Sequence, residues 1–159
     1  MEKDKPVNGV EKEIEILEFR SGGYSYGVDL NDVREILPNK SKLLPVPNAH
    51  PSMEGIIKPR DFLIPIINFE KSLKLAGADE FKTDMLIVSN INDLNIAFRV
   101  DSVRSIHKIL PSEIVKPGKK LTTTLRGVVT GILTKDDYKI EIVDFRNIII
   151  DINPEVNVG

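Results

Sequence analysis

Residues 50–75 read His50-Pro-Ser-Met-Glu-Gly-Ile-Ile-Lys-Pro-Arg-Asp-Phe-Leu-Ile-Pro-Ile-Ile-Asn-Phe-Glu-Lys-Ser-Leu-Lys-Leu75. Two apolar segments, residues 53–57 and 62–69, flank the polar residues 58–61, a pattern typical of two strands joined by a turn. The second segment is nearly all apolar, so both of its faces are expected to be buried. Because Pro65 lacks a backbone N–H, its place in a strand is expected to be a sheet edge or a bulge.

Short segments of this kind recur along the chain. Alternating apolar and polar residues on both sides of Gly22-Gly23 predict a β-hairpin. Further pairs of strands are predicted at residues 85–88 with 96–100, and at residues 128–133 with 138–145. This succession predicts an all-β fold, either a sandwich or a barrel.

Helical patterns are few and short. Asn31 can cap a helix that places Val33 and Ile36 on one face. Another short helix is predicted from residue 69, and the apolar residues 147–152 fit either a strand or a helix. Helices are therefore expected only as small additions to the sheets.

Composition and charge narrow the function classes. The chain has 159 residues, of which 41% are hydrophobic, enough for a compact module with one or two small cores. The formal net charge of −2 argues against extensive neutralisation of a nucleic-acid backbone. The absence of cysteine excludes disulfides and thiolate metal sites, and it is typical of a cytoplasmic protein. No apolar run reaches the roughly 18 residues of a membrane span, so no membrane insertion is expected.

The two ends of the chain are polar. Residues 1–12 are expected to form a disordered arm, and residues 153–159 a tail or the start of a linker. Between them, residues 13–152 are expected to fold as two subdomains separated near residues 78–84, where the sequence is polar.

No set of side chains predicts catalysis, a metal site or a cofactor. His50 and His107 lie far apart in the sequence, and neither has a second type of ligand at metal-binding spacing. Asp136-Asp137 is better explained as a hairpin turn, where aspartate bonds to the local backbone. A β-barrel module that binds nucleic acid or oligosaccharide is the alternative function. Against it, the basic residues at 116–120 have no aromatic neighbours on which bases could stack.

Arg60 allows two interpretations. It is either a surface arginine paired with Asp61 or Glu54, or an exposed guanidinium beside an apolar surface. A surface pair contributes little stability, whereas arginine beside apolar surface is enriched at interface hot spots. The residues alone favour neither interpretation.

Five elements in the same order resemble the CheW-like chemotaxis coupling domain. They are Tyr26-Gly-Val-Asp-Leu30, Val33-Arg-Glu-Ile36, the stretch at 50–75, Val100-Asp-Ser-Val103 and Glu141-Ile-Val-Asp-Phe145. The resemblance spans residues 14–152. It implies two small SH3-like five-stranded β-barrels, with a hydrophobic seam between them and short helices.

The resemblance also implies an adaptor that joins chemoreceptors to the histidine kinase CheA, in the cytoplasm at receptor arrays. One surface would contact the regulatory domain of CheA, and the groove between the barrels would take the helical signalling tip of the receptor. By position, the resemblance implies partner-binding roles for Arg60, Val33, Ile36, Gly55 and Val88.

The turn at residues 58–61 departs from the family pattern Asn-Leu-Arg-Gly. Pro59 fixes a backbone angle, and Asp61 replaces a glycine that would adopt positive φ freely. This turn is more similar to that of CheV, in which the domain precedes a receiver domain. The resemblance therefore implies either a standalone coupling protein or a part of a longer one.

Overall fold

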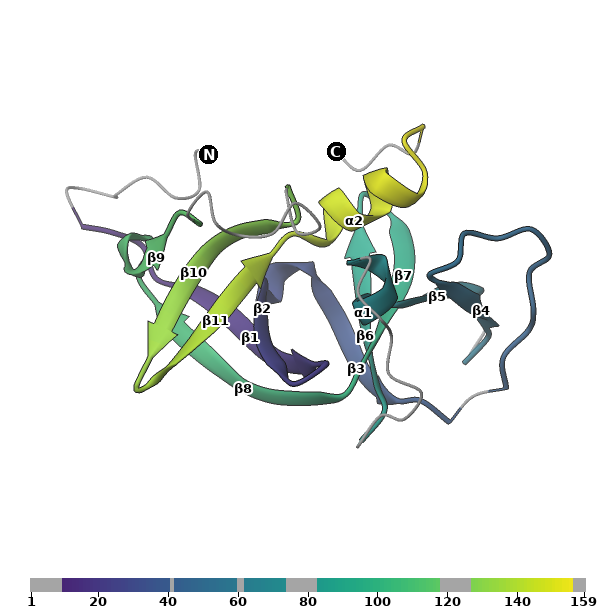
Figure 1. Cartoon of the computed structure of the whole chain (residues 1–159), viewed down its shortest axis with the longest axis horizontal. Helices are drawn as coiled ribbons and strands as arrows, with labels where there is room; N and C mark the ends of the chain where they lie inside the picture. The colour runs from purple at the N-terminus through teal and green to yellow at the C-terminus, as the bar shows by residue number, and fades with distance from the viewer. Residues whose placement is uncertain (1–9, 41, 60–61, 74–82, 118–126, 156–159) are drawn as a thin grey trace.

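The computed structural model describes residues 10–40, 42–59, 62–73, 83–117 and 127–155. Two β-sheets lie side by side, with two short α-helices beside them (Figure 1). No helix within the described ranges is long and apolar enough to cross a membrane. The predicted all-β architecture is confirmed.

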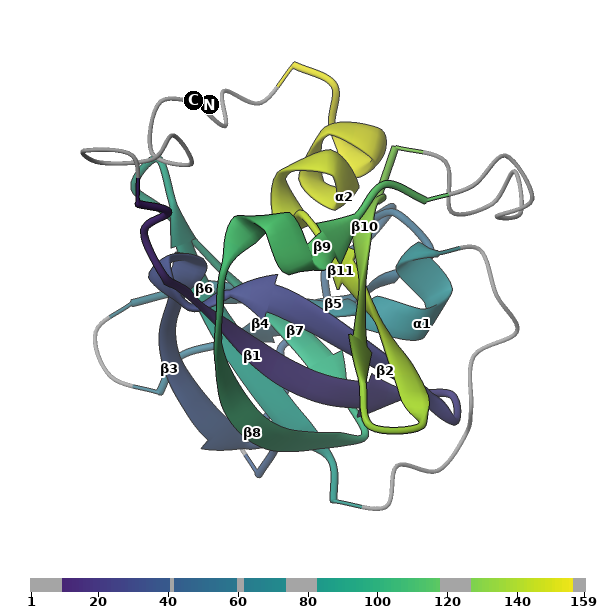
Figure 2. The same cartoon turned by 90° about the vertical axis from the view of Figure 1, so that its left-hand side faces the viewer.

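The first sheet has six strands in the order β8-β1-β2-β11-β10-β9, and it faces the viewer in Figure 2. Its strands are β1 (Ile14–Ser21), β2 (Tyr24–Asp29), β8 (Ser102–Ile109), β9 (Ile114–Val115), β10 (Val129–Lys135) and β11 (Tyr138–Val143). The predicted hairpin β1–β2 turns at Gly22 and Gly23, whose φ angles are 60° and 86°, a conformation that costs glycine little. The sheet has one strand more than expected, because the two-residue β9 pairs with β10.

The second sheet has five strands in the order β3-β6-β7-β5-β4. Its strands are β3 (Val33–Pro38), β4 (Met53–Ile57), β5 (Ile64–Asn68), β6 (Met85–Ile91) and β7 (Leu94–Val100). The stretch at 50–75 supplies the antiparallel pair β4–β5. Pro65 pairs with Ile56 of β4, and the parallel pairing of β5 with β7 begins one residue later, at Ile66. Because β5 lies between β7 and β4, the expected place of Pro65 at a sheet edge is wrong.

The predicted helix after Asn31 is wrong. The chain leaves β2 through a single 3-10 turn, η2 (Leu30–Asp32), in which the Asp29 carboxylate accepts a hydrogen bond from the backbone N–H of Asn31. The next residues form β3, which pairs antiparallel with β6. The ladder hydrogen bonds to β6 replace those of a helix that would have been too short to be stable alone.

The two sheets are interleaved along the sequence. The first takes its strands from residues 14–29 and 102–143, and the second from residues 33–100. Strands β5 and β6, on either side of residues 78–84, belong to the same sheet. The boundary between the two sheets therefore does not fall at residues 78–84. The pairing of strands decides which sheet a strand joins, and the polar composition of a connecting segment does not.

One apolar cluster contains residues of both sheets and both α-helices, α1 (Phe69–Ser72) and α2 (Phe145–Ile152). In it, Phe98 of β7 stacks on Phe145 with ring centroids 3.9 Å apart, and Phe19 of β1 meets Phe69 edge-on at 4.9 Å. Each sheet also encloses a smaller apolar cluster of its own. The predicted hydrophobic seam between the two halves is confirmed.

Helix α2 resolves the ambiguous segment at 147–152, and it lies along one side of the seam (Figure 1). The Asp144 carboxylate caps it by accepting a hydrogen bond from the N–H of Arg146. The Arg146 guanidinium donates two hydrogen bonds of 2.8 Å to Asp32 in η2, and this pairing raises the pKa of Arg146. The helix is thus fixed to the end of β2 as well as to the core.

The expected N-terminal arm is described in part. Residues 1–9 lie outside the described residues, as do residues 156–159 of the expected tail. The Glu11 carboxylate accepts hydrogen bonds from the N–H and the hydroxyl of Ser112, at 2.8 and 2.6 Å. Glu11, which the sequence placed in the arm, is therefore tied to the six-stranded half.

Candidate functional site

Two large apolar side chains are exposed immediately before β5. Phe62 is 49% exposed and Leu63 is 61% exposed. The sequence predicted them as the buried start of a strand, but β5 begins only at Ile64. Exposed apolar side chains that lie together mark binding surfaces more often than single ones do.

A groove of about 640 Å³ opens beside these two residues. The five-stranded half of the molecule forms one wall, and α2 forms the other. Its apolar lining includes Met53, Phe62, Leu63, Leu94, Ile149 and Ile152. Within the described ranges, no lining residue comes from the six-stranded sheet. The volume and the apolar lining are those of a binding site with a few polar groups at its border.

The β6–β7 turn shapes the sheet side of the groove. Asn92 and Asp93 have φ angles of 50° and 65°, the conformation of a tight hairpin turn. Directly after it, the Asn95 side-chain oxygen accepts hydrogen bonds from Arg34 at 3.0 Å and from Asn90 at 2.9 Å. The Arg34 guanidinium carbon lies 5.4 Å from the centre of the Phe62 ring, within the range of a cation–π contact.

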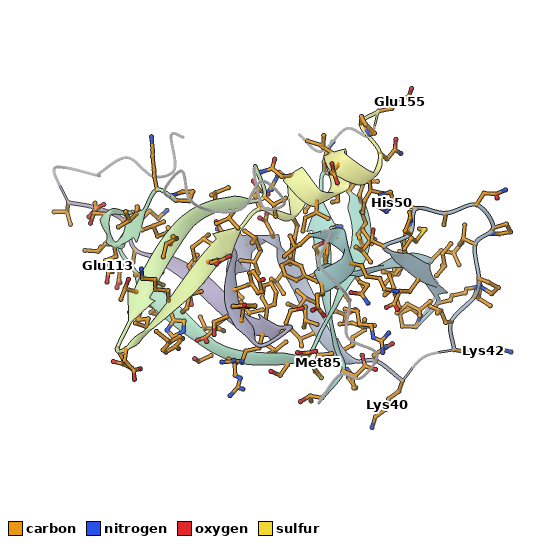
Figure 3. The ribbon with its side chains drawn as sticks, in the orientation of Figure 1. Lys40, Lys42, His50, Met85, Glu113 and Glu155 are labelled. Atoms are coloured by element: carbon orange, nitrogen blue, oxygen red, sulfur yellow. The ribbon has the colours of Figure 1, made fainter. Side chains whose placement is uncertain are left out.

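His50 lies at the border of the groove, where the chain approaches β4 (Figure 3). Its Nδ1 accepts a hydrogen bond from the backbone N–H of Ser52 at 3.1 Å and lies 2.8 Å from the Ser52 hydroxyl. These bonds fix the turn that leads into β4. They assign His50 a structural role at the border of the groove.

Of the five residues that the resemblance assigned to partner binding, Val33 and Ile36 lie on β3, Val88 lies on the neighbouring strand β6, and Gly55 lies on β4. Val88 has no exposed surface and belongs to the core of the five-stranded half. Val33 is partly buried against the shared core. Ile36 is 37% exposed, but it does not line the groove. Val88 is thus a core residue of the five-stranded half, and its role in partner binding stays a prediction.

Gly55 serves packing within the domain. Its φ angle is 148°, and a Cβ atom there would lie 2.6 Å from the backbone oxygen of Leu44 and 2.7 Å from the Leu43 side chain. Leu44 forms a bridge with Ile56 of β4. Glycine at this position therefore lets the preceding loop lie against β4.

Arg60 and Asp61 lie outside the described residues. Glu54, the other carboxylate considered as a partner for Arg60, accepts a hydrogen bond of 2.9 Å from Arg99. Arg99 also bonds to Asp84 at 2.7 Å, which raises the pKa of Arg99. This pairing makes Glu54 part of a clamp that joins β4, β7 and the start of β6.

The groove residues were missed because they come from distant parts of the sequence. Phe62, Leu94 and Ile149 belong to three segments that only the fold brings together. The one local sign of exposed apolar residues was that Phe62 and Leu63 directly follow a polar segment, so they are the first residues of the apolar run.

The fold and the groove together define a β-rich docking domain. Two small sheets share a core, and the groove offers apolar surface with a single carboxylate, Asp93, among its described lining residues. Within the described ranges, no group of three or more His, Cys, Asp or Glu side chains could hold a metal ion.

Comparison with known proteins identifies the family. The family model of the CheW-like domain matches residues 15–152, so the chain belongs to the CheW-like domain family. Chemotaxis protein CheW of Thermotoga maritima is 31% identical over 103 residues, which are 65% of this chain and 67% of that protein. Chemotaxis protein CheW of Treponema pallidum is 23% identical over 148 residues, or 90% of this chain and 86% of that one.

A solved structure is similar over nearly the whole length. The crystal structure of the scaffolding protein TtCheW from Thermoanaerobacter tengcongensis matches with a TM-score of 0.79 and 26% identity. The match covers 93% of this chain and 97% of that one. The chain is a chemotaxis scaffold domain of the CheW type.

Proposed function

We propose that this chain is a non-enzymatic adaptor that couples chemoreceptors to the histidine kinase CheA. The observation that carries the proposal is an apolar groove between the five-stranded half and α2, in a domain of the CheW-like family. An adaptor needs surfaces that bind partners, and it needs no nucleophile, general base or metal centre.

The groove is the proposed site for the helical signalling tip of the receptor. An amphipathic helix can lay its apolar face into an apolar groove, with side chains spaced three and four residues apart as anchors. Phe62, Leu63 and Leu94 supply the wall on the side of the five-stranded half, and Ile152 belongs to the opposite wall on α2. Because the walls belong to the shared core and to a capped helix, the groove is held open before the partner arrives.

Arg60 is proposed to contribute to the contact with a partner. It is two residues before Phe62 in the sequence, and arginine is among the residues enriched at interface hot spots. Glu54, the carboxylate that could have held Arg60 in a local surface pair, already pairs with Arg99. CheA is proposed to bind another surface through its regulatory domain, so that one domain holds both partners at the receptor arrays of the cytoplasm.

A pull-down with the purified CheA regulatory domain and a receptor signalling fragment tests this proposal. We expect the wild-type chain to retain both partners. We expect Arg60→Glu to lose at least one of them with its fold intact, because like-charge contacts and lost hot-spot arginines cost an interface several kcal/mol, or roughly a hundredfold in affinity.

Lys108→Glu on β8 is the matched control, since Lys108 is exposed and lies in the other sheet. It makes the same change of charge and should retain the receptor fragment. A folded wild-type chain that retains neither partner would contradict the adaptor function. Normal assembly by Arg60→Glu would remove only the role of Arg60.

A further inference from the structure

Within the described ranges, Arg34 is a cation beside the border of the groove, and hydrogen bonds among neutral side chains fix its position. Arg34 on β3 donates to Asn95 on β7, and Asn95 also accepts from Asn90 on β6. The pairing of β3 with β6, and of Asn90 with Asn95 directly across β6–β7, places this row across three neighbouring strands. Arg34 is therefore held by the sheet, although its side chain is exposed to solvent.

The charge of Arg34 is not neutralised within the part of the chain that the structure describes. Its hydrogen-bond partner is the amide of Asn95, and its other contact is the face of the Phe62 ring. Glu35, the next residue along β3, is partly buried, lines the same small hollow as Arg34 and is engaged in an interaction of its own. Asp93 is the carboxylate of the groove, two residues before Asn95. An exposed guanidinium stacked on an apolar ring is well suited to donate hydrogen bonds to a carboxylate of a partner.

Arg34 also contacts Phe62. Phe62 lines the groove, and it lines as well a small hollow at the end of the five-stranded half that Arg34 shares. The ring thus separates the two spaces, with the guanidinium 5.4 Å from its centre. Loss of the guanidinium would leave the half-exposed ring free to change rotamer and to narrow or widen the groove.

We propose that Arg34 is a specificity-determining residue of the groove. It holds the Phe62 ring in place as part of the groove wall. It also pairs with an acidic side chain of the docking helix, next to the apolar face of that helix. This inference rests on the proposed function, and it adds the chemistry of the occupant. The partner segment is an amphipathic helix with an acidic residue at the end of the groove nearest β3.

Binding of a receptor signalling fragment to the full chain, measured over a series of salt concentrations, tests this inference. Arg34→Gln should weaken binding about tenfold and flatten its salt dependence, because a paired charge at the interface is lost. Arg34→Glu should weaken binding further. Arg34→Lys should keep the salt dependence but bind less tightly, because lysine lacks the planar group that stacks on Phe62.

Lys108→Glu provides the control for a general change of charge. Wild-type affinity and salt dependence in Arg34→Gln would overturn the inference, as would an equal loss in Lys108→Glu and Arg34→Glu. A wild-type chain that does not bind the fragment at all would contradict the proposed function itself, and the inference with it. Unchanged thermal unfolding of the variants verifies that the effects are local.

Discussion

Replacing Phe145 by alanine is expected to lower the free energy of unfolding by about 3–5 kcal/mol, the usual cost of deleting a buried aromatic ring. Phe145 is fully buried and stacks on Phe98 of the five-stranded sheet. Its ring also lies 6.2 Å from that of Phe19 in the six-stranded sheet. The cavity would therefore open at the seam, where both halves lose contacts. Urea unfolding of the wild type and the variant measures the effect.

The same variant tests whether the two sheets form one cooperative unit. If they share a single core, hydrogen exchange should show that β1–β2 and β6–β7 lose protection together. The matched control is Phe62→Ala, which removes the same ring from a half-exposed position and should cost less than about 1 kcal/mol. Loss of protection in only one sheet would contradict the shared core.

Gly55→Ala is expected to destabilise the domain by about 2–4 kcal/mol, through backbone strain and overpacking combined. The new Cβ would lie 2.6 Å from the backbone oxygen of Leu44, and φ at this position is 148°. Backbone oxygen cannot move aside as a flexible side chain can, so the segment that contains Leu44 would have to leave β4. Urea unfolding again measures the change.

Gly23→Ala is the control for strain alone. Its φ angle is also positive, at 86°, but a Cβ atom there meets nothing within 4 Å. It should cost about 1 kcal/mol, the penalty for a positive φ without a clash. Equal costs at the two glycines would show that the loop before β4 does not pack as the structure has it.

The hairpins could be predicted because the turn residues and the two strands of each hairpin are close together in the sequence. Gly22 and Gly23 mark a turn between alternating segments, and the two-residue turn at Asn92-Asp93 likewise separates two strands. Each strand pairs with its neighbour in sequence, so the pattern alone was sufficient. The resemblance to the CheW-like family extended this local information to the two-part architecture.

The error at residues 33–38 has a physical reason. Val33, Ile36 and Leu37 have the spacing of one helical face, but in β3 the side chains of Val33 and Leu37 are the partly buried ones and Ile36 is the exposed one. Pairing with β6 selects the alternation of a strand over the spacing of a helix, and β6 is about fifty residues away in the sequence. No pattern within six residues contains that information.

The candidate groove could not be predicted for a related reason. Its walls meet because β5 pairs with β7 and because α2 packs on the shared core, and both contacts are long-range. Phe62 and Leu63 have the composition of a buried strand, and only the fold leaves them exposed. The partner roles of Arg60, Val33, Ile36, Gly55 and Val88 remain predictions from resemblance.

Site-specific photo-crosslinking to a receptor signalling fragment is the most direct test of the groove as the docking site. A photoreactive amino acid in place of Leu63, which is 61% exposed, is compared with one in place of Val115, which is 65% exposed on the six-stranded sheet. The account predicts a crosslink from position 63 and none from position 115. A crosslink from position 115 alone would contradict it, because the receptor would then bind the other half of the molecule.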